Sequence, residues 1–427
     1  MIMQPTLRRP YRRAGAAALA TATSLVLAAT LAPTASAAIP VPNAGSSIGD
    51  GWETRAVARA ASKVVGHSAP GMSIAIVKRN PDKPDEAITT TYHFGLADKE
   101  NQRPVGPQTQ FEIASETKTF TAALLAKRVD EGLSTLGDLA QDYEHDVTFP
   151  TMDDTAVTLG DLVTHRSGLT DDPGNLNAGC PGGGDHGCSD AKALYNRTLL
   201  WEGLEAPGAL ASAPGSEWIY SDFGFGTLGT LMADAYAPGH AEPRFADVVQ
   251  RELTGPLGMT GTVIESPTPD LAVPYANGGP TDLWNNTGAL AGGGGLISTA
   301  ADMAKWVAAT LGYGDDPLVP VLQSMLDPIP GVAPTRMPNM QMGMAWQLFP
   351  PQNGINRPYA FKDGGASGMT SATYLVPSEG WGVTVMANGD SEHTDGVALD
   401  LMRELAPDYP APPESGSGSL SFGSLGS

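Results

Sequence analysis

The pattern of apolar and polar positions predicts sheet-forming segments near the start of the chain. An amphipathic stretch at residues 52–65 predicts a helix, and the apolar run "MSIAIV" at 72–77 predicts a strand. The turn sequence "NPDKPDE" follows, and "AITTTYHFGLAD" at 87–98 predicts a second strand. Helix, strand, turn and strand in this order indicate an antiparallel sheet with a helix laid across it.

Strand signals return only towards the other end of the chain. "GMAWQLF", "SATYLVP" and "GVTVMANG" each predict a strand, and a last helix is expected at 394–405. The residues between, roughly 138–336, have the pattern of short helices and Gly/Pro-rich loops. Their clearest helix is "STAADMAKWVAATLG", with Ser298 or Thr299 as N-cap. The predicted fold class is α/β, more exactly α+β: an antiparallel sheet flanked by N- and C-terminal helices, with a large, mainly helical lobe inserted.

Both ends of the sequence differ from this pattern. Residues 1–37 combine an arginine-rich start with an Ala/Leu-rich run and the small-residue end "ASA", which is typical of a secretory signal peptide. Export by the general or the twin-arginine route stays open. Residues 411–427 are rich in Gly and Ser and are expected to be disordered. The sequence thus predicts a secreted, extracytoplasmic domain at 38–410 with no transmembrane segment, and leaves open whether it stays attached to the envelope.

Composition and charge narrow the possible partners. The 51 glycines and 36 prolines among 427 residues exceed ordinary usage, which indicates a globular protein with many ordered turns. The formal net charge of −21 would become −25 without the four arginines of residues 1–37. Such an acidic chain is a poor candidate for nucleic-acid binding, which requires a basic surface. A monomer acting on a small molecule or peptide is expected.

The two cysteines, Cys180 and Cys188, enclose a glycine-rich loop, "CPGGGDHGC". In a secreted protein the simplest interpretation is one disulfide that closes this loop. A metal site that also uses Asp185 and His186 is the alternative. No other segment has the spacing of a zinc site, so neither a metal nor a cofactor is expected.

The segment "EIASETKTF" carries candidate chemistry. Ser115 lies at the predicted N-terminus of a helix, and Lys118 lies one turn further on the same face. The free N–H groups and positive dipole of a helix N-terminus favour a developing alkoxide on the serine. A lysine screened from water can accept the serine proton. Ser-x-x-Lys alone is a common pattern, however, and an N-cap serine beside a solvated lysine also explains it.

Two further motifs follow in a specific order. "PGSEWIYSDFGFGTLG" places Tyr220-Ser221-Asp222 in a loop before an apolar helix, and "AFKDGGASGMTSATYLV" places Lys362-Asp363-Gly364-Gly365 at the end of an extended segment. Together with "LVTHRSGL", "GPLGMTGT" and "AGGGGLISTAADMAKW", this order resembles the serine β-lactamase and penicillin-binding-protein superfamily, in its class C β-lactamase and D-alanyl-D-alanine carboxypeptidase branch. The resemblance extends from about residue 52 to 405.

This resemblance implies a role for each matching residue. Ser115 would be the nucleophile that forms an acyl-enzyme, Lys118 its base, and Tyr220 the proton relay to the leaving group and later to water. The backbone N–H groups of Ser115 and Gly365 would form the oxyanion hole. The histidine of "LVTHRSGL", His165, would be structural. The residues expected to contact substrate are Asp222, Lys362, Asp363 and Gly364.

Two of these residues depart from the superfamily pattern. Asp222 stands where an asparagine is usual, and a carboxylate cannot donate a hydrogen bond to a substrate carbonyl. Asp363 replaces a threonine that normally helps to bind a substrate carboxylate. One hypothesis is that both changes shift the enzyme towards esters, amides or cationic peptides. The other is that the two aspartates only neutralise Lys118 and Lys362.

The leading functional prediction is a secreted serine hydrolase of the D-alanyl-D-alanine carboxypeptidase or β-lactamase type. The substrate would be a cell-wall peptide, a β-lactam or an ester. An esterase or D-aminopeptidase on the same scaffold is the first alternative. A sensor that is acylated by penicillin but does not turn it over is the second.

Overall fold

The computed structural model describes residues 40–49, 51–181, 187–238, 244–264, 268–389 and 394–405. The predicted signal peptide at 1–37 and the Gly/Ser-rich tail at 411–427 lie outside these residues. Asp185 and His186, the proposed partners of the alternative metal site, also lie outside them.

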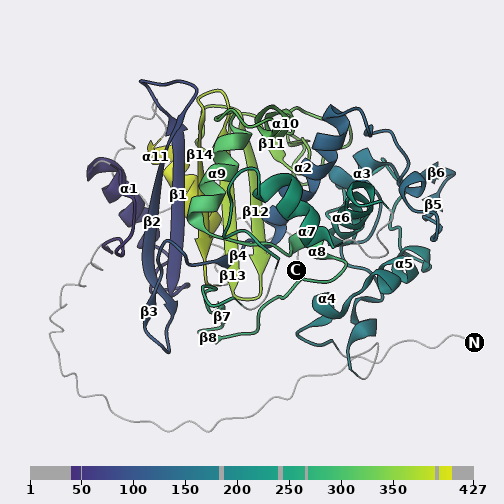
Figure 1. Cartoon of the computed structure of the whole chain (residues 1–427), viewed down its shortest axis with the longest axis horizontal. Coiled ribbons are helices and arrows are strands. Elements are labelled where there is room, and N and C mark those ends of the chain that lie inside the picture. Colours follow the sequence, from purple (N-terminus) through teal and green to yellow (C-terminus); the bar gives the residue numbers. More distant parts are fainter. Residues whose placement is uncertain are drawn as a thin grey trace, which may run out of the picture. The chain divides into compact units, whose positions relative to one another are not determined.

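The largest sheet among the described residues has eight strands, and every neighbouring pair is antiparallel (Figure 1). Its order, β10-β11-β12-β13-β14-β1-β2-β3, places the first long strand of the chain directly beside the last. This confirms that segments from both ends of the sequence build one sheet. The strands are β1 (Gly71–Arg79), β2 (Ala87–Asp98), β3 (Arg103–Pro104), β10 (Gln341–Met342), β11 (Gln347–Phe349), β12 (Tyr359–Ala366), β13 (Met369–Val376) and β14 (Trp381–Ala387).

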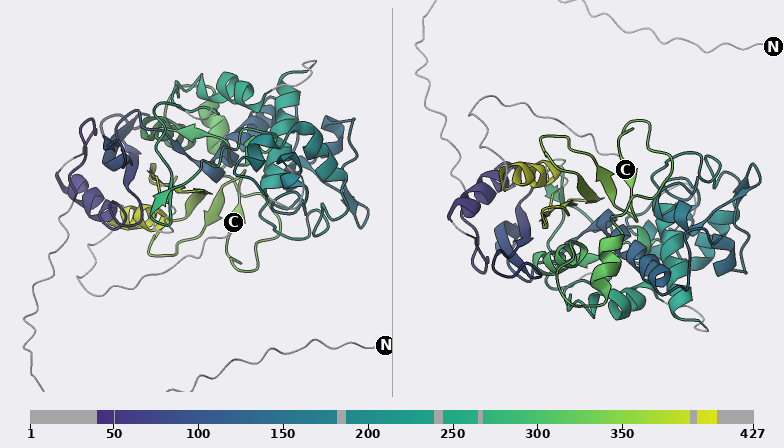
Figure 2. Two further views of the ribbon diagram at one scale, coloured as in Figure 1. Left: turned by 90° about the horizontal axis from the view of Figure 1, so that it is seen from below. Right: turned by 90° about the horizontal axis from the view of Figure 1, so that it is seen from above.

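Both faces of this sheet are covered by helices, and the side chains alternate accordingly. Ile74 and Ile76 of β1 pack into an apolar cluster with α1 (Gly51–Ala61) and α11 (Thr394–Leu405). Ala75 and Val77 face the opposite cluster, where α9 (Ala300–Thr310) crosses β1 and β14. Figure 2 shows α1 and α11 side by side along one face of the sheet. The predicted flanking helices are therefore confirmed.

Between the two groups of strands the chain is mainly helical, as expected (Figure 1). Short strand pairs interrupt the helices: β5 (Thr151–Met152) with β6 (Thr155–Ala156), β7 (Tyr275–Ala276) with β8 (Gly279–Pro280), and β4 (Phe111–Glu112) with β9 (Ile297–Ser298). The remaining helices are α2 (Thr117–Asp130), α3 (Leu159–Val163), α4 (Ala191–Leu194), α5 (Arg197–Glu205), α6 (Asp222–Tyr236), α7 (Phe245–Val249), α8 (Ala291–Gly294) and α10 (Leu318–Ser324), with single-turn elements η1 (Ala114–Glu116), η2 (Ala140–Tyr143), η3 (Leu176–Gly179) and η4 (Gln250–Thr254).

Two local predictions need correction. The segment "GMAWQLF" is not one strand, because Ala345 has a φ of +63° and turns the chain, so that only Gln347–Phe349 is extended. Asp222 is the first residue of α6, not part of a loop, because the Ser221 side chain caps that helix by accepting from the Gly224 N–H. The Lys362-Asp363-Gly364-Gly365 motif, by contrast, lies at the end of β12 as predicted, since Gly365 and Ala366 are the last two residues of that strand and pair with β13.

The sulfur atoms of Cys180 and Cys188 are bonded in the structure. This disulfide lies immediately before α4, whose Ala191 N–H donates to the Cys188 carbonyl over 3.2 Å. The cysteine pair thus fixes the start of the segment that carries α4.

Candidate active site

Ser115 lies in the tight turn η1, which continues directly into α2. The preceding residue, Ala114, has a φ of +43°, a conformation that L-residues other than glycine rarely adopt. This turn packs directly against two strands of the sheet. Ser371 of β13 donates to the Ile113 carbonyl over 3.0 Å, and β12 passes so close that a Cβ at Gly364 would lie 2.1 Å from the same oxygen. The position of Ser115 therefore depends on close backbone contact with β12 and β13.

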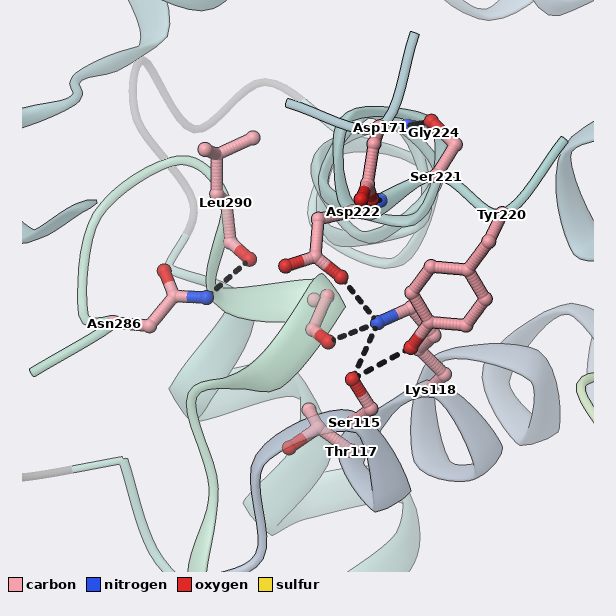
Figure 3. Close-up of polar contacts among 12 residues, drawn as sticks. Ser115, Thr117, Lys118, Asp171, Tyr220, Ser221, Asp222, Gly224, Asn286 and Leu290 are labelled. Carbon is pink, nitrogen blue, oxygen red and sulfur yellow. Dashed lines mark hydrogen bonds and ion pairs between the residues drawn. The ribbon is translucent and has the colours of Figure 1, made fainter. Parts of the chain in front are cut away.

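Three predicted residues meet at the Ser115 hydroxyl (Figure 3). Lys118 Nζ donates to Ser115 Oγ over 3.0 Å, and Tyr220 OH donates to the same oxygen over 2.6 Å. Lys118 comes from α2, one turn after the serine, whereas Tyr220 arrives from the loop before α6. The structure thus brings together two segments that are 105 residues apart.

Lys118 is completely buried, and its Nζ has three hydrogen-bond partners. Besides Ser115, its Nζ donates to Asp222 Oδ1 over 2.5 Å and to the Gly293 carbonyl over 2.6 Å. Burial lowers the pKa of Lys118, and Asp222 opposes this effect only in part. In the neutral amine, Asp222 and Gly293 would take the two N–H groups, so that the lone pair would face Ser115.

Tyr220 is held between the lysines and His165. Its ring stacks on the His165 imidazole with 4.4 Å between centroids, and Lys118 Nζ lies 4.7 Å from the same ring. Burial raises the pKa of Tyr220 well above its ordinary value, so the hydroxyl keeps its proton near neutral pH. Burial also lowers the pKa of His165 far below its usual range, and the neutral Nδ1 accepts from the Ser221 N–H over 3.1 Å. His165 thereby orients the tyrosine segment.

Asp222 bridges two lysines. Its Oδ1 binds Lys118, and its Oδ2 accepts from Lys192 Nζ over 2.7 Å. Burial alone would raise the pKa of Asp222, but the two ammonium groups outweigh burial and hold the pKa well below its usual range. For Asp222 the geometry therefore matches the second hypothesis, in which the aspartate neutralises lysine.

The β12 motif also lies close to Tyr220. Lys362 is buried, and its Nζ lies 5.5 Å from the Tyr220 ring centre. The same ammonium donates to the backbone carbonyl of Asp363 over 2.6 Å and to Asp363 Oδ1 over 3.1 Å, while the Asp363 side chain remains 44% exposed. A Cβ at Gly365 would meet no atom within 4 Å, so this stretch of β12 borders open space beside the serine.

Sequence reasoning did not identify two groups of this site. Lys192 belongs to no motif. Gly293 lies within the matched segment "AGGGGLISTAADMAKW", but the resemblance assigned no role to its backbone carbonyl. Among the described residues, no group of three or more His, Cys, Asp or Glu side chains is placed to hold a metal ion. In the same part of the chain, every helix is too short or too polar to cross a bilayer.

The fold is that of the serine β-lactamase and transpeptidase superfamily of hydrolases, as the sequence motifs predicted. Within that class, the chain belongs to the Beta-lactamase family, whose model matches residues 54–406.

Similar proteins include enzymes with different substrates. The D-alanyl-D-alanine-carboxypeptidase/endopeptidase AmpH of Escherichia coli K12 is 29% identical over 323 residues, which cover 70% of this chain and 77% of AmpH. The unguisins hydrolase of Aspergillus campestris is also 29% identical, over 79% of this chain and 63% of that protein.

Solved structures establish the fold. A class C β-lactamase superposes with a TM-score of 0.68 at 21% identity, covering 83% of this chain and 97% of that enzyme. A β-lactamase/D-alanine carboxypeptidase from Pseudomonas syringae superposes with a TM-score of 0.65 at 22% identity, covering 84% and 99%.

Proposed function

We propose that this protein is a secreted serine hydrolase that works through an acyl-enzyme on Ser115, of the D-alanyl-D-alanine carboxypeptidase or β-lactamase type. The observation that carries the proposal is the hydrogen-bonded group of Ser115, Lys118 and Tyr220. Family membership supports the reaction class, and the basic, Ala/Leu-rich start of the sequence supports export.

The charges around the serine support a division of roles. Lys118 has a lowered pKa and a hydrogen-bond pattern that directs its lone pair at Ser115 Oγ, which suits a general base. Tyr220 keeps its proton, so it can pass that proton to the leaving group and be reprotonated by Lys118, which has accepted the proton of Ser115. In the second half-reaction the same pair would activate the water that cleaves the acyl-enzyme.

The oxyanion formed after attack would be stabilised by the backbone N–H groups of Ser115 and Gly365. Ser115 lies in a helical turn whose N–H groups precede α2, and Gly365 lies on the open stretch of β12 beside it. One such donor typically contributes about 3 kcal/mol to the transition state.

Replacing the proposed nucleophile tests this mechanism. Ser115→Ala should lower the rate of nitrophenyl acetate hydrolysis at least about 10³-fold and abolish labelling by a fluorescent penicillin. Ester turnover by the wild type indicates a hydrolase, whereas a persistent penicillin label without any turnover indicates a sensor or a carboxypeptidase. Activity that survives in Ser115→Ala would refute the mechanism.

One observation favours a second candidate, an esterase or D-aminopeptidase. Lys362, the cation expected to bind a substrate carboxylate, already binds the carboxylate of Asp363. A substrate carboxylate would have to compete with Asp363 and would be repelled by it.

The two candidates differ in their response to a substrate carboxylate. If Asp363 blocks carboxylate binding, a D-Ala-D-Ala peptide should be hydrolysed no faster than its C-terminal amide, and Asp363→Thr should raise kcat/KM for the free acid selectively. The measurement is kcat/KM for both peptides with wild type and variant. A strong preference of the wild type for the free acid would support the carboxypeptidase instead.

A further inference from the structure

The second lysine on Asp222, Lys192, takes no part in the proton transfers among Ser115, Lys118 and Tyr220. Lys192 comes from α4, outside the three catalytic motifs and 30 residues before Asp222. Its side chain is only 8% exposed and reaches the same carboxylate as Lys118. A lysine is rarely buried to this extent unless it is paired.

The surroundings of Lys192 keep it positively charged. Its ammonium contacts Asp222 Oδ2 at 2.7 Å and Asp172 Oδ1 at 3.1 Å, and it lies 4.1 Å from the centre of the Trp284 ring. Burial would lower the pKa of Lys192, but the two carboxylates outweigh burial and raise it. Lys192 and Lys118 therefore differ: the pKa of the first is raised above its ordinary value, and the pKa of the second is lowered.

This difference resolves a conflict in the site. An isolated aspartate 2.5 Å from Lys118 would hold that lysine as an ammonium ion, because deprotonation would leave a buried carboxylate without a counter-charge. An ammonium ion cannot accept the proton of Ser115. With Lys192 on the other oxygen, Asp222 remains paired when Lys118 becomes neutral.

We propose that Lys192 is a positioning residue that supplies the permanent counter-charge of Asp222 and so allows Lys118 to act as the base of Ser115. This proposal rests on the proposed function. Asp222 in turn orients Lys118 through one N–H, while Lys192 holds the carboxylate from the opposite side.

Other charged and titratable groups also act on Lys118, and they come from several elements. They are Asp222 on α6, Lys192 on α4, Asp171 and His165 in the loops around them, Tyr220 before α6, and Lys362 on β12. Only Asp222 and Tyr220 among them contact Lys118 or its serine partner directly. Lys192 thus acts on Lys118 through the Asp222 carboxylate, which accepts hydrogen bonds from both lysines.

The test is the pH dependence of kcat/KM for nitrophenyl acetate between about pH 5 and 9. Lys192→Met removes the counter-charge of Asp222, so the pKa of Lys118 should rise and the acidic limb of the pH profile should move to higher pH by about one unit or more. At a given pH on that limb, kcat/KM should then be about tenfold lower. Lys192→Arg keeps the charge and should leave the limb near its wild-type position. Adding Asp222→Asn to Lys192→Met removes the carboxylate that needs a counter-charge, so the double variant should move the limb back down.

Lys63→Met is the matched control, because Lys63 pairs with Asp400 on the opposite side of the sheet. It should leave the limb unchanged, and the melting temperature of each variant shows whether it folds. A wild-type limb in a folded Lys192→Met would overturn the role of Lys192, as would a limb that Asp222→Asn fails to restore. Either result, together with an inactive Ser115→Ala, would leave the proposed function intact; an active Ser115→Ala would remove both.

Discussion

At the scale of single residues, the neighbour of the proposed nucleophile is unusual. Glu116 follows Ser115 directly, yet it is only 1% exposed. Its side chain contacts β13, where Thr373 donates to Glu116 Oε2 over 2.8 Å. Burial raises the pKa of Glu116 from its ordinary value of 4.5 to about 8, against smaller opposing effects of Thr373 and Lys362. This carboxyl is therefore protonated in the folded protein at neutral pH.

Glu116 should make stability depend on pH. Because its pKa is higher in the folded state, its contribution is fully present below pH 4.5 and is lost as the pH rises towards 8. Glu116→Gln keeps an acceptor for Thr373 and removes this loss. Relative to wild type, the variant should gain on the order of 4 kcal/mol of unfolding free energy between pH 5 and pH 9.

Urea unfolding of both proteins at these two pH values measures the difference. If the two pH profiles run parallel, the carboxyl is not neutral in the folded state. The same experiment with Glu100→Gln, an exposed acid on the surface, controls for the change of charge alone.

The sequence identified the residues of this site that belong to motifs, and missed those that do not. Ser115 and Lys118 are one helical turn apart, so their contact follows from local geometry. Asp222 was recognised as a departure, but its effect depends on Lys192, which is brought to it by α4. A contact between residues that share no motif cannot be predicted from one sequence.

At the scale of elements, the nucleophile turn and β12 are built as a pair. Gly364 allows the strand to pass directly beneath Ile113, since even one methyl group would lie 2.1 Å from the Ile113 oxygen. Ala114 is held in a left-handed conformation at the same place. Both features indicate that the serine is positioned by backbone contact with the sheet rather than by the helix alone.

Gly364→Ala should therefore separate β12 from the turn. We expect a loss of at least about 2 kcal/mol of stability from the overpacked contact. We also expect a fall of about 10² in kcat/KM, because the serine moves relative to Tyr220 and β12. Thermal melts and esterase kinetics measure the two effects.

Gly396→Ala in α11, where an added Cβ meets no atom within 4 Å, is the control and should be neutral or slightly stabilising. Unchanged activity in a folded Gly364→Ala would show that this contact does not position Ser115.

The strong periodic elements were predictable, and the irregular ones were not. The last helix was predicted at Thr394–Leu405, and all of these residues are helical in the structure; Thr299 caps α9 as one of two expected residues. Ala345 shows the opposite case: an apolar run predicts a strand, but a left-handed residue held by a backbone bond from Ala345 N–H to the Val163 carbonyl breaks it. Such tertiary contacts override local propensity.

At the scale of the whole molecule, the sheet joins the two ends of the chain around the helical segments. The register of β1 against β14, with Ile74 opposite Val385, places the N- and C-terminal strands in one core. The hydrophobic pattern placed the sheet-forming segments at both ends of the sequence with a helical block between them, and the order of the motifs indicated the same fold through a family resemblance. The site lies where β12 and β13 meet η1, α2 and the start of α6, so its residues become neighbours only in the folded chain.

The central claim is that Ser115 becomes acylated during turnover. The most direct test is rapid acid quench of the reaction with a fluorescent penicillin or nitrophenyl acetate, followed by intact mass measurement and peptide mapping. We expect the mass of one acyl group on the peptide that contains Ser115 for at least one of these reagents, and no adduct in Ser115→Ala. An adduct on another residue, an adduct in Ser115→Ala, or turnover of both reagents without an adduct from either would contradict the account.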